Sequence, residues 1–376
     1  MIEAPFTALT DQPLVARFLT AVCQSNMPSH AYLFVGPQGA GKTEAAHLLA
    51  QALLCPNGGC GACDDCIRIA HKTHPDYHII DPLGAAGYLT EQTAEIIHDA
   101  SLAPIRASHK VYLLTRADLL KGAPANALLK TLEEPLGKVT FILLARTREG
   151  VMPTLLSRCQ VLPFRRIPEE EAVNVLVERS KTTRQIARRA LAATGGSRFR
   201  AEEFLSSSER REARIAVIQA LECLPRSDDF EVLEMVKSLF VIMKEPLDVV
   251  KIEQQLQLDA SKDYLSKGGL TQLEQQHRRN LTNRERETTG EALDVIRSWL
   301  RDILLVRLGK RDEMVNDDFS YHIEQIAERL DETNVARSLI AVDRAQEQIQ
   351  YNVSKELALE TLFFAIRDEI SGKEFI

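Results

Sequence analysis

This 376-residue chain is predicted to begin with an α/β domain, in which helices cover both faces of a parallel sheet, and to continue as helices alone. Three observations predict that class. Short apolar runs alternate with helical patterns over residues 1–166, a glycine-rich motif links one such run to a helix, and the strand signal fades from Pro168 onward.

Each short apolar run suits a strand that is buried on both sides. The expected strands are residues 31–35, 77–80, 110–115, 139–145 and 160–164. Helices are expected between them, at residues 42–54, 91–102 behind a Thr90 cap, 122–134 and 151–156.

The remainder of the chain divides at two breaks. Residues 194–197 separate two short helical pieces, and the serines at 206–208 mark a boundary. Beyond it, long amphipathic helices are expected, with one apolar face formed by Leu293, Ile296, Leu300, Ile303 and Leu304. On pattern alone, such faces suit an internal core and a contact between subunits equally well. We therefore predict three domains, at residues 1–166, 167–207 and 208–376.

Charge and hydropathy limit the classes of function. The 46 Lys and Arg against 53 Asp and Glu give a net charge of −7, so no overall basic field attracts nucleic acid. A DNA contact would need a local patch, and Arg106, Lys110 and Arg146 are either candidates for one or plain solvated surface. No apolar run is long enough for a membrane span and no secretory leader is visible, so a cytoplasmic protein is expected.

The glycine-rich motif is a complete phosphate-binding loop that follows an apolar strand and precedes a helix, made of Gly36, Pro37, Gln38, Gly39, Ala40, Gly41, Lys42 and Thr43. Its glycines let backbone N–H groups surround phosphate oxygens, and the helix N-terminus adds a positive dipole end. Lys42 would reach the terminal phosphates and Thr43 would ligate Mg²⁺. ATP or ADP with Mg²⁺ is therefore the expected cofactor.

The strand at 110–115 lacks the acids that hydrolysis needs. A carboxylate at the strand tip normally holds Mg²⁺ and a second one orients the attacking water, but Thr115 and Arg116 stand at these positions. Asp118, two residues further on, is a candidate for a displaced acid. We interpret the site as one that binds nucleotide with little or no turnover. The alternatives are an autonomous ATPase that uses Asp118 and a structural adaptor with an empty nucleotide pocket.

Four of the seven cysteines lie close together, at Cys55, Cys60, Cys63 and Cys66. In a reducing compartment, this spacing indicates a metal site rather than disulfides. Four thiolates with glycines between them can close a tetrahedral shell around Zn²⁺ and leave no position for water, so a structural zinc site is predicted. An iron–sulfur cluster and free buried thiols are the alternatives. Cys23 and Cys223 have no partners at metal spacing and are expected to be plain buried thiols.

Several segments carry a resemblance to one family. They are His30–Gly36, Asn126–Pro135, Ser157-Arg158-Cys159, and Asn352 with Leu357–Glu360. Together with the phosphate loop they resemble the clamp-loader subunits of bacterial replicative DNA polymerase, within the AAA+ class, over most of the chain. The resemblance implies a RecA-like sheet domain, then a small helical lid domain and an all-helical oligomerisation collar.

The resemblance also implies a role for Arg158. In this family the arginine of Ser-Arg-Cys is an arginine finger that acts in trans, at the ATP site of a neighbouring subunit, and a permanent planar cation suits that role. Spacing alone favours an ion pair of Arg158 within its own fold. The motor subunit, tau/gamma, has an acid pair where this chain has Thr115 and Arg116. The chain is more similar to the subunit type that keeps Ser-Arg-Cys and lacks the acids.

The implied partners are tau/gamma and delta subunits in a hetero-pentameric ring, the sliding clamp through that ring, and primer–template DNA. Thr147 would be the phosphate-sensing residue after the fourth strand, and the second sensor arginine is either Arg198 or Arg200. Two features depart from the family pattern. Many subunits of this type have a damaged phosphate loop, whereas this one is intact, and the first two cysteines are separated by four residues instead of eight.

Overall fold

The computed structural model describes residues 5–25, 28–84, 87–134, 137–261, 267–350 and 353–371. The chain separates into two compact units, one of residues 1–168 with 265–280 and the other of residues 169–264 with 281–376. The first boundary lies within two residues of the predicted one. The predicted lid and most of the predicted collar fall in the second unit, whereas residues 265–280 of the collar are grouped with the first, and the division into three domains stays a prediction.

A five-stranded parallel sheet forms the centre of the first unit. Its strands are β1 (Ala31–Val35), β2 (Tyr77–Ile80), β3 (Lys110–Leu114), β4 (Val139–Ala145) and β5 (Gln160–Pro163). They pair in the order β2-β3-β4-β1-β5, with Leu33 opposite both Leu143 and Val161. All five predicted strands are confirmed to within one residue at each end.

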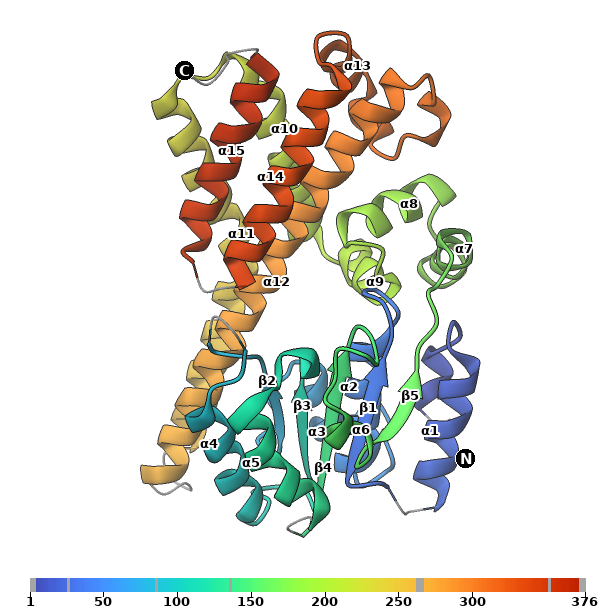
Figure 1. The fold of residues 1–376 in the computed structure, drawn as a ribbon, viewed down its shortest axis with the longest axis vertical. Helices are drawn as coiled ribbons and strands as arrows, with labels where there is room; N and C mark the ends of the chain where they lie inside the picture. The colour runs from blue at the N-terminus through green and yellow to red at the C-terminus, as the bar shows by residue number, and fades with distance from the viewer. Residues whose placement is uncertain are drawn as a thin grey trace. The chain divides into compact units, whose positions relative to one another are not determined.

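Helices cover both faces of this sheet, as predicted: α4 and α5 lie in front of it and α2 and α3 behind it (Figure 1). The helices of this unit are α1 (Pro13–Ser25), α2 (Lys42–Leu54), α3 (Asp64–Ala70), α4 (Thr90–Ser101), α5 (Gly122–Glu133) and α6 (Pro153–Leu156). The Thr90 cap is wrong, because Leu89 is the N-cap of α4. Gln92 Oε1 accepts from the Leu89 N–H at 3.4 Å, so a side-chain amide and not the Thr90 hydroxyl binds the backbone at the start of α4.

The two central strands explain the strength of the apolar signal. Every residue of β3 and β4 is buried, and the rings of Tyr112 and Phe141 stack with centroids 5.2 Å apart. Lys110 is only 1% exposed, and its ammonium donates to the Asp99 carbonyl at 2.8 Å. Lys110 is therefore neither solvated surface nor a candidate for DNA contact.

The second unit is helical throughout its described residues. It contains α7 (Glu169–Ser180), α8 (Arg184–Ala193), α9 (Arg198–Ser206), α10 (Ser208–Cys223), α11 (Asp229–Ser261), most of α12 (Lys267–Arg307), α13 (Ser320–Ala327), α14 (Glu332–Gln350) and α15 (Lys355–Ser371). The predicted breaks at 194–197 and 206–208 both separate helices. The apolar face from Leu293 to Ile303 is buried around Trp299, which supports the internal-core interpretation of that face.

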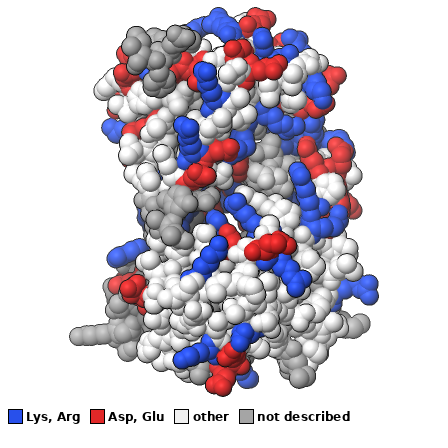
Figure 2. Space-filling model, in the orientation of Figure 1, with Lys and Arg blue, Asp and Glu red and all other residues white. Residues whose placement is uncertain are grey.

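Lys/Arg and Asp/Glu side chains are interspersed on the face drawn in Figure 2, in keeping with the near balance of charges in the sequence. Cys23 is partly buried, but Cys223 is exposed, so its prediction as a buried thiol is wrong. Among the described helices, none combines the length and the apolar character of a membrane span.

Candidate nucleotide site and cysteine cluster

The phosphate loop has the backbone that its glycines predict. Gly39 and Gly41 adopt φ angles of 76° and 82°, in the left-handed region that residues with a Cβ seldom occupy. Gly36 is needed for a different reason, since a Cβ there would lie 2.4 Å from the carbonyl oxygen of Phe164. The loop therefore passes directly against the end of β5.

Helix α2 starts from this loop with its first N–H groups lacking a side-chain cap. Gly41 is the N-cap and makes no side-chain cap bond, whereas α9 and α10 are capped by the hydroxyls of Ser197 and Ser207. Uncapped N–H groups at a helix N-terminus are the donors that bind phosphate. This arrangement fits an anionic ligand.

Lys42 lies over the same loop. Its ammonium donates to the carbonyls of Gly36 and Pro37, each at 2.6 Å. Burial lowers the pKa of Lys42 to about 8; Glu44 and Asp118 oppose that shift, and the Arg146 guanidinium adds to it. The charges of Arg146 and Asp118 therefore both act on the lysine of the loop.

Gln12, which the sequence analysis did not identify, ties the loop to the end of the sheet domain. Its amide nitrogen donates to the carbonyls of Ala40 at 3.0 Å and Arg165 at 2.8 Å, and its oxygen accepts from the Arg165 N–H at 3.2 Å. The side chain is buried, and these contacts span up to 153 positions in sequence. No local pattern points to such a contact, so only the fold reveals it.

The tip of β3 is occupied by internal contacts. The Thr115 hydroxyl donates to Asp81, which follows β2. The Arg116 guanidinium pairs with Asp118, with Nη2 3.0 Å from Oδ2. Asp118 lies beyond the strand in a 3₁₀ turn (Ala117–Leu119), so the candidate displaced acid is already bound to a cation of its own chain.

Thr147, the predicted sensor, follows β4 and lies near the same turn. Its hydroxyl accepts from the Gly150 N–H at 3.3 Å, and a Cβ on Gly150 would be 3.4 Å from both the Thr147 hydroxyl and the Asp118 Cβ. The fold therefore brings Thr147 and Asp118 to the same edge of the sheet as the phosphate loop.

Arg158 lies between α6 and β5 and is partly exposed. Its Nε donates to Glu133 at 2.7 Å, and its Nη1 donates to the Thr154 carbonyl at 3.0 Å and to the Ser157 hydroxyl at 3.1 Å. The ion pair that spacing alone favoured is therefore present within this chain. Its acceptor, Glu133, is the last residue of α5 and belongs to the Asn126–Pro135 segment. Two residues of the segments that carry the family resemblance, Pro135 and Asn352, lie outside the described residues.

The two candidates for the second sensor arginine are both engaged within the second unit. Arg198 is fully buried and pairs with Glu202 at 2.6 Å. Arg200 pairs with Glu291 at 3.3 Å and with Asp294 at 3.7 Å, both on α12. These contacts do not favour either arginine as the second sensor.

The four predicted cysteines come together between the end of α2 and the start of α3. Their sulfur atoms all lie within 4.8 Å of one another, with Cys55 Sγ 3.8 Å from Cys60 Sγ and 3.5 Å from Cys63 Sγ. Tetrahedral zinc with Zn–S bonds of about 2.3 Å requires sulfur atoms about 3.8 Å apart. The thiols form no disulfide, and the donor set fits a metal ion.

Local backbone geometry builds this cluster. Gly58 and Gly59, between Cys55 and Cys60, and Gly61, between Cys60 and Cys63, have φ angles of 69°, 91° and 73°, which let the chain turn tightly between the cysteines. The N–H groups of Ala62 and Cys63 lower the pKa of Cys60 to about 6, whereas burial raises the pKa of Cys66. Backbone donors therefore favour a thiolate at Cys60.

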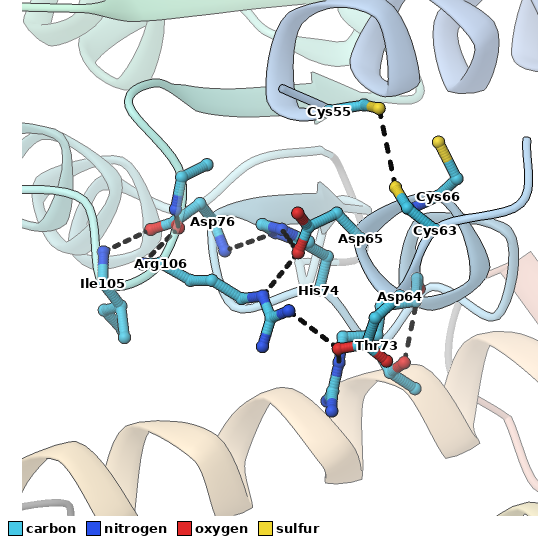
Figure 3. Close-up of polar contacts among 12 residues, drawn as sticks. Cys55, Cys63, Asp64, Asp65, Cys66, Thr73, His74, Asp76, Ile105 and Arg106 are labelled. Atoms are coloured by element: carbon cyan, nitrogen blue, oxygen red, sulfur yellow. Dashed lines mark hydrogen bonds and ion pairs between the residues drawn. The ribbon is translucent and has the colours of Figure 1, made fainter. Parts of the chain in front are cut away.

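A charged network supports the cluster from the adjacent loop (Figure 3). Arg106 pairs with Asp65 and, at 2.8 Å, with Asp64, the residues between Cys63 and Cys66. The carboxylate of the fully buried Asp76 accepts from the N–H groups of Ile105 at 2.6 Å and Arg106 at 2.8 Å. Arg106 is thus a structural support of the cluster, and its candidacy as a DNA contact has no support here.

The chain is a P-loop protein of the AAA+ class. Three features define that class: an intact phosphate loop after β1, a polar residue after β4 and the strand order β2-β3-β4-β1-β5. Family profiles described as "DNA polymerase III, delta subunit" and "DNA polymerase III, delta subunit, C terminal" match residues 11–168 and 269–368. The chain belongs to this family, with a delta prime-like role in the bacterial clamp loader.

Individual relatives agree with this assignment. The chain is 27% identical over 360 residues to DNA polymerase III subunit delta' of Bacillus subtilis, covering 95% of this chain and 96% of that protein. It is 32% identical to subunit delta' of Pseudomonas aeruginosa over 52% of this chain and 61% of that protein. It is 33% identical to subunit gamma/tau of Mycobacterium tuberculosis over 44% of this chain but only 29% of that protein.

Among solved structures, a gamma subunit-related protein of Thermotoga maritima overlaps 94% of this chain and 99% of its own, at 15% identity and a TM-score of 0.40. The family assignment rests on the sequence matches.

Proposed function

We propose that this chain binds ATP or ADP with little or no turnover and supplies Arg158 in trans to the ATP site of a neighbouring tau/gamma subunit. One observation carries the proposal: a whole phosphate loop lies beside a β3 tip at which Thr115 and Arg116 replace the acids. The neighbouring subunit would hydrolyse ATP, and this chain would supply a charge for the transition state.

The contacts of Arg158 are compatible with such a role. The guanidinium and Glu133 are both partly exposed, with 30% and 47% of their side-chain surface accessible. Ion pairs of this kind contribute about 0–1 kcal/mol, so exchanging Glu133 for a phosphate of a neighbour costs little. Arginine also keeps its charge throughout the cycle and can contact phosphate oxygens through two N–H groups.

The partners in this proposal are tau/gamma and delta subunits, in a hetero-pentameric ring that loads the sliding clamp on primer–template DNA. The similarity to tau, gamma/tau and delta' subunits supports the loader as the assembly. Contacts with the clamp and with DNA would be made by the ring as a whole.

The cysteine cluster is proposed to hold one structural zinc ion. Cys55, Cys60, Cys63 and Cys66 supply four sulfur donors at a spacing suitable for tetrahedral coordination, which leaves no position for a reacting water. The ion would join the C-terminus of α2 to α3 and take no part in phosphate chemistry.

The experiment is a reconstituted loader that carries Arg158→Ala. We expect nucleotide binding by the isolated chain to be unchanged and hydrolysis at the adjacent site to fall at least about tenfold, since an arginine finger contributes 10³-fold or more elsewhere. The matched control is Arg148→Ala, an exposed arginine of the same unit, which should leave loader ATPase intact. Unchanged ATPase in the Arg158 variant would refute the finger.

The same material tests the rival functions. Steady-state hydrolysis by the isolated chain that Asp118→Ala abolishes would favour an autonomous ATPase, although the Arg116 pair opposes that role for Asp118. Undetectable binding of labelled ATP would favour a structural adaptor. Nucleotide binding without turnover is the result we expect.

A further inference from the structure

The site that should hold Mg²⁺ beside a phosphate loop has an unsuitable donor set. In P-loop proteins that ion is held by the loop hydroxyl, a strand-tip carboxylate, phosphates and waters. Thr43 supplies the loop hydroxyl. At the tip of β3, however, the Thr115 hydroxyl is neutral and donates to Asp81.

Asp118, the displaced acid that the sequence offers, is also unsuitable. Arg116 Nη2 lies 3.0 Å from one oxygen of Asp118, and Arg116 Nε lies 3.3 Å from each of its oxygens. A divalent cation at Asp118 would have to displace a permanent guanidinium or lie next to it, and like charges repel strongly where burial reduces the screening by water. Neither Thr115 nor Asp118 therefore fits as the residue of the β3 tip that would hold a magnesium ion.

Two cations of the chain, Lys42 and Arg146, belong to the phosphate loop and to the segment hydrogen-bonded to it. Lys42 is on the loop itself, and Arg146 follows directly on Ala145, whose carbonyl accepts from the Gly36 N–H at 3.2 Å. The pKa of Lys42 is lowered first by burial and further by the Arg146 guanidinium. Two positive charges therefore act on the same small region beside the uncapped start of α2.

We infer that this site takes a nucleoside di- or triphosphate as the metal-free polyanion, with Lys42 and Arg146 balancing the charge that Mg²⁺ balances in hydrolysing relatives of the fold. This inference rests on the proposed nucleotide binding and concerns its metal requirement. It replaces the sequence-based expectation that Thr43 ligates Mg²⁺.

Calorimetric titration of the full chain with ADP and with ATP, in excess Mg²⁺ and in excess EDTA, tests the inference. We expect dissociation constants that agree within about threefold, because the β3 tip supplies no carboxylate that would hold the metal. Binding that is tenfold or more weaker in EDTA would overturn the inference and leave the proposed nucleotide binding intact. Absence of binding in both conditions would instead overturn that part of the proposed function.

Two variants sharpen the test. Arg146→Gln should weaken binding in EDTA about tenfold, the loss expected for one charge-assisted hydrogen bond. Its matched control, Arg148→Gln, changes an exposed arginine two positions away and should have no effect. The double change Thr115→Asp with Arg116→Glu should introduce a magnesium dependence of about tenfold or more. Circular dichroism establishes that each variant is folded, and equal affinities in a folded Arg146→Gln protein would contradict the role of Arg146.

Discussion

The two ends of helix α2 carry two kinds of ligand site that differ in completeness. At its C-terminus, Cys55 and three more cysteines already lie at the spacing that a tetrahedral metal requires. At its N-terminus, the loop and Lys42 are arranged for phosphate, while Thr115 and Asp118 are engaged by other side chains. One helix therefore joins the proposed structural metal site, whose four donors are all in place, to the proposed nucleotide site, which lacks the acids for turnover.

The largest expected effect lies at the cysteine end. Elemental analysis should find about one zinc per chain, and Cys66→Ser should remove it and lower the melting temperature. A metal present at a thousandfold its dissociation constant contributes about 4 kcal/mol to folding. The control, Cys223→Ser, changes an exposed thiol outside the cluster and should retain both zinc and stability. Full zinc content in the Cys66 variant would exclude four-cysteine coordination.

At the other end of α2, Lys42→Met should weaken nucleotide binding at least tenfold, because a hydrogen bond to a charged group contributes about 1.5–3 kcal/mol. Equilibrium titration measures this effect, and zinc content should not change. Lys121→Met, at an exposed lysine before α5, is the control. A simultaneous loss of zinc would show that the two ends of the helix are not independent.

A smaller effect is expected at Gln12. Gln12→Ala leaves the Ala40 and Arg165 carbonyls without their buried donor, which costs about 1–3 kcal/mol of unfolding free energy. Denaturant titration should detect this loss, with Gln24→Ala on exposed α1 surface as the control. If the Gln12 variant also binds nucleotide more weakly while keeping its zinc, the tether acts on the phosphate end alone.

The smallest effect concerns His109, which directly precedes β3. Burial lowers the pKa of His109 from 6.5 to about 4, and its Nε2 lies 2.8 Å from the Thr140 hydroxyl. Because the unfolded chain takes up a proton at higher pH than the folded one, stability should fall as the pH drops below 6.5, by no more than about 2 kcal/mol at pH 5. Comparing His109→Gln with the parent protein over pH 5–7.5 isolates this contribution. Parallel stability curves for the two proteins would contradict it.

Local signals predicted much of the first unit. The eight loop residues, the five strands and the gathering of four cysteines all follow from short patterns, because each depends on neighbours in sequence. Helices α1 and α3 were not predicted. The sequence analysis also missed the ion pair of Arg116 with Asp118 and the choice of Glu133 as the partner of Arg158. Side-chain pairs of this kind depend on the backbone conformation of the turns that carry them. Gln12 and Lys110 show the same limit over longer distances: each polar group is buried by partners that are remote in sequence.

The close approach of Gly36 to Phe164 has a mechanical consequence. Gly36 packs so closely on the Phe164 carbonyl that a Cβ there would lie 2.4 Å from its oxygen, and Gln12 bonds to Ala40 of the loop and to Arg165 after the strand. Residues 165–168 lead from there into the second unit. A displacement of that connecting segment would therefore act on the loop through the Gln12 hydrogen bonds, and a phosphate bound at the loop, as proposed, would restrain the segment in turn.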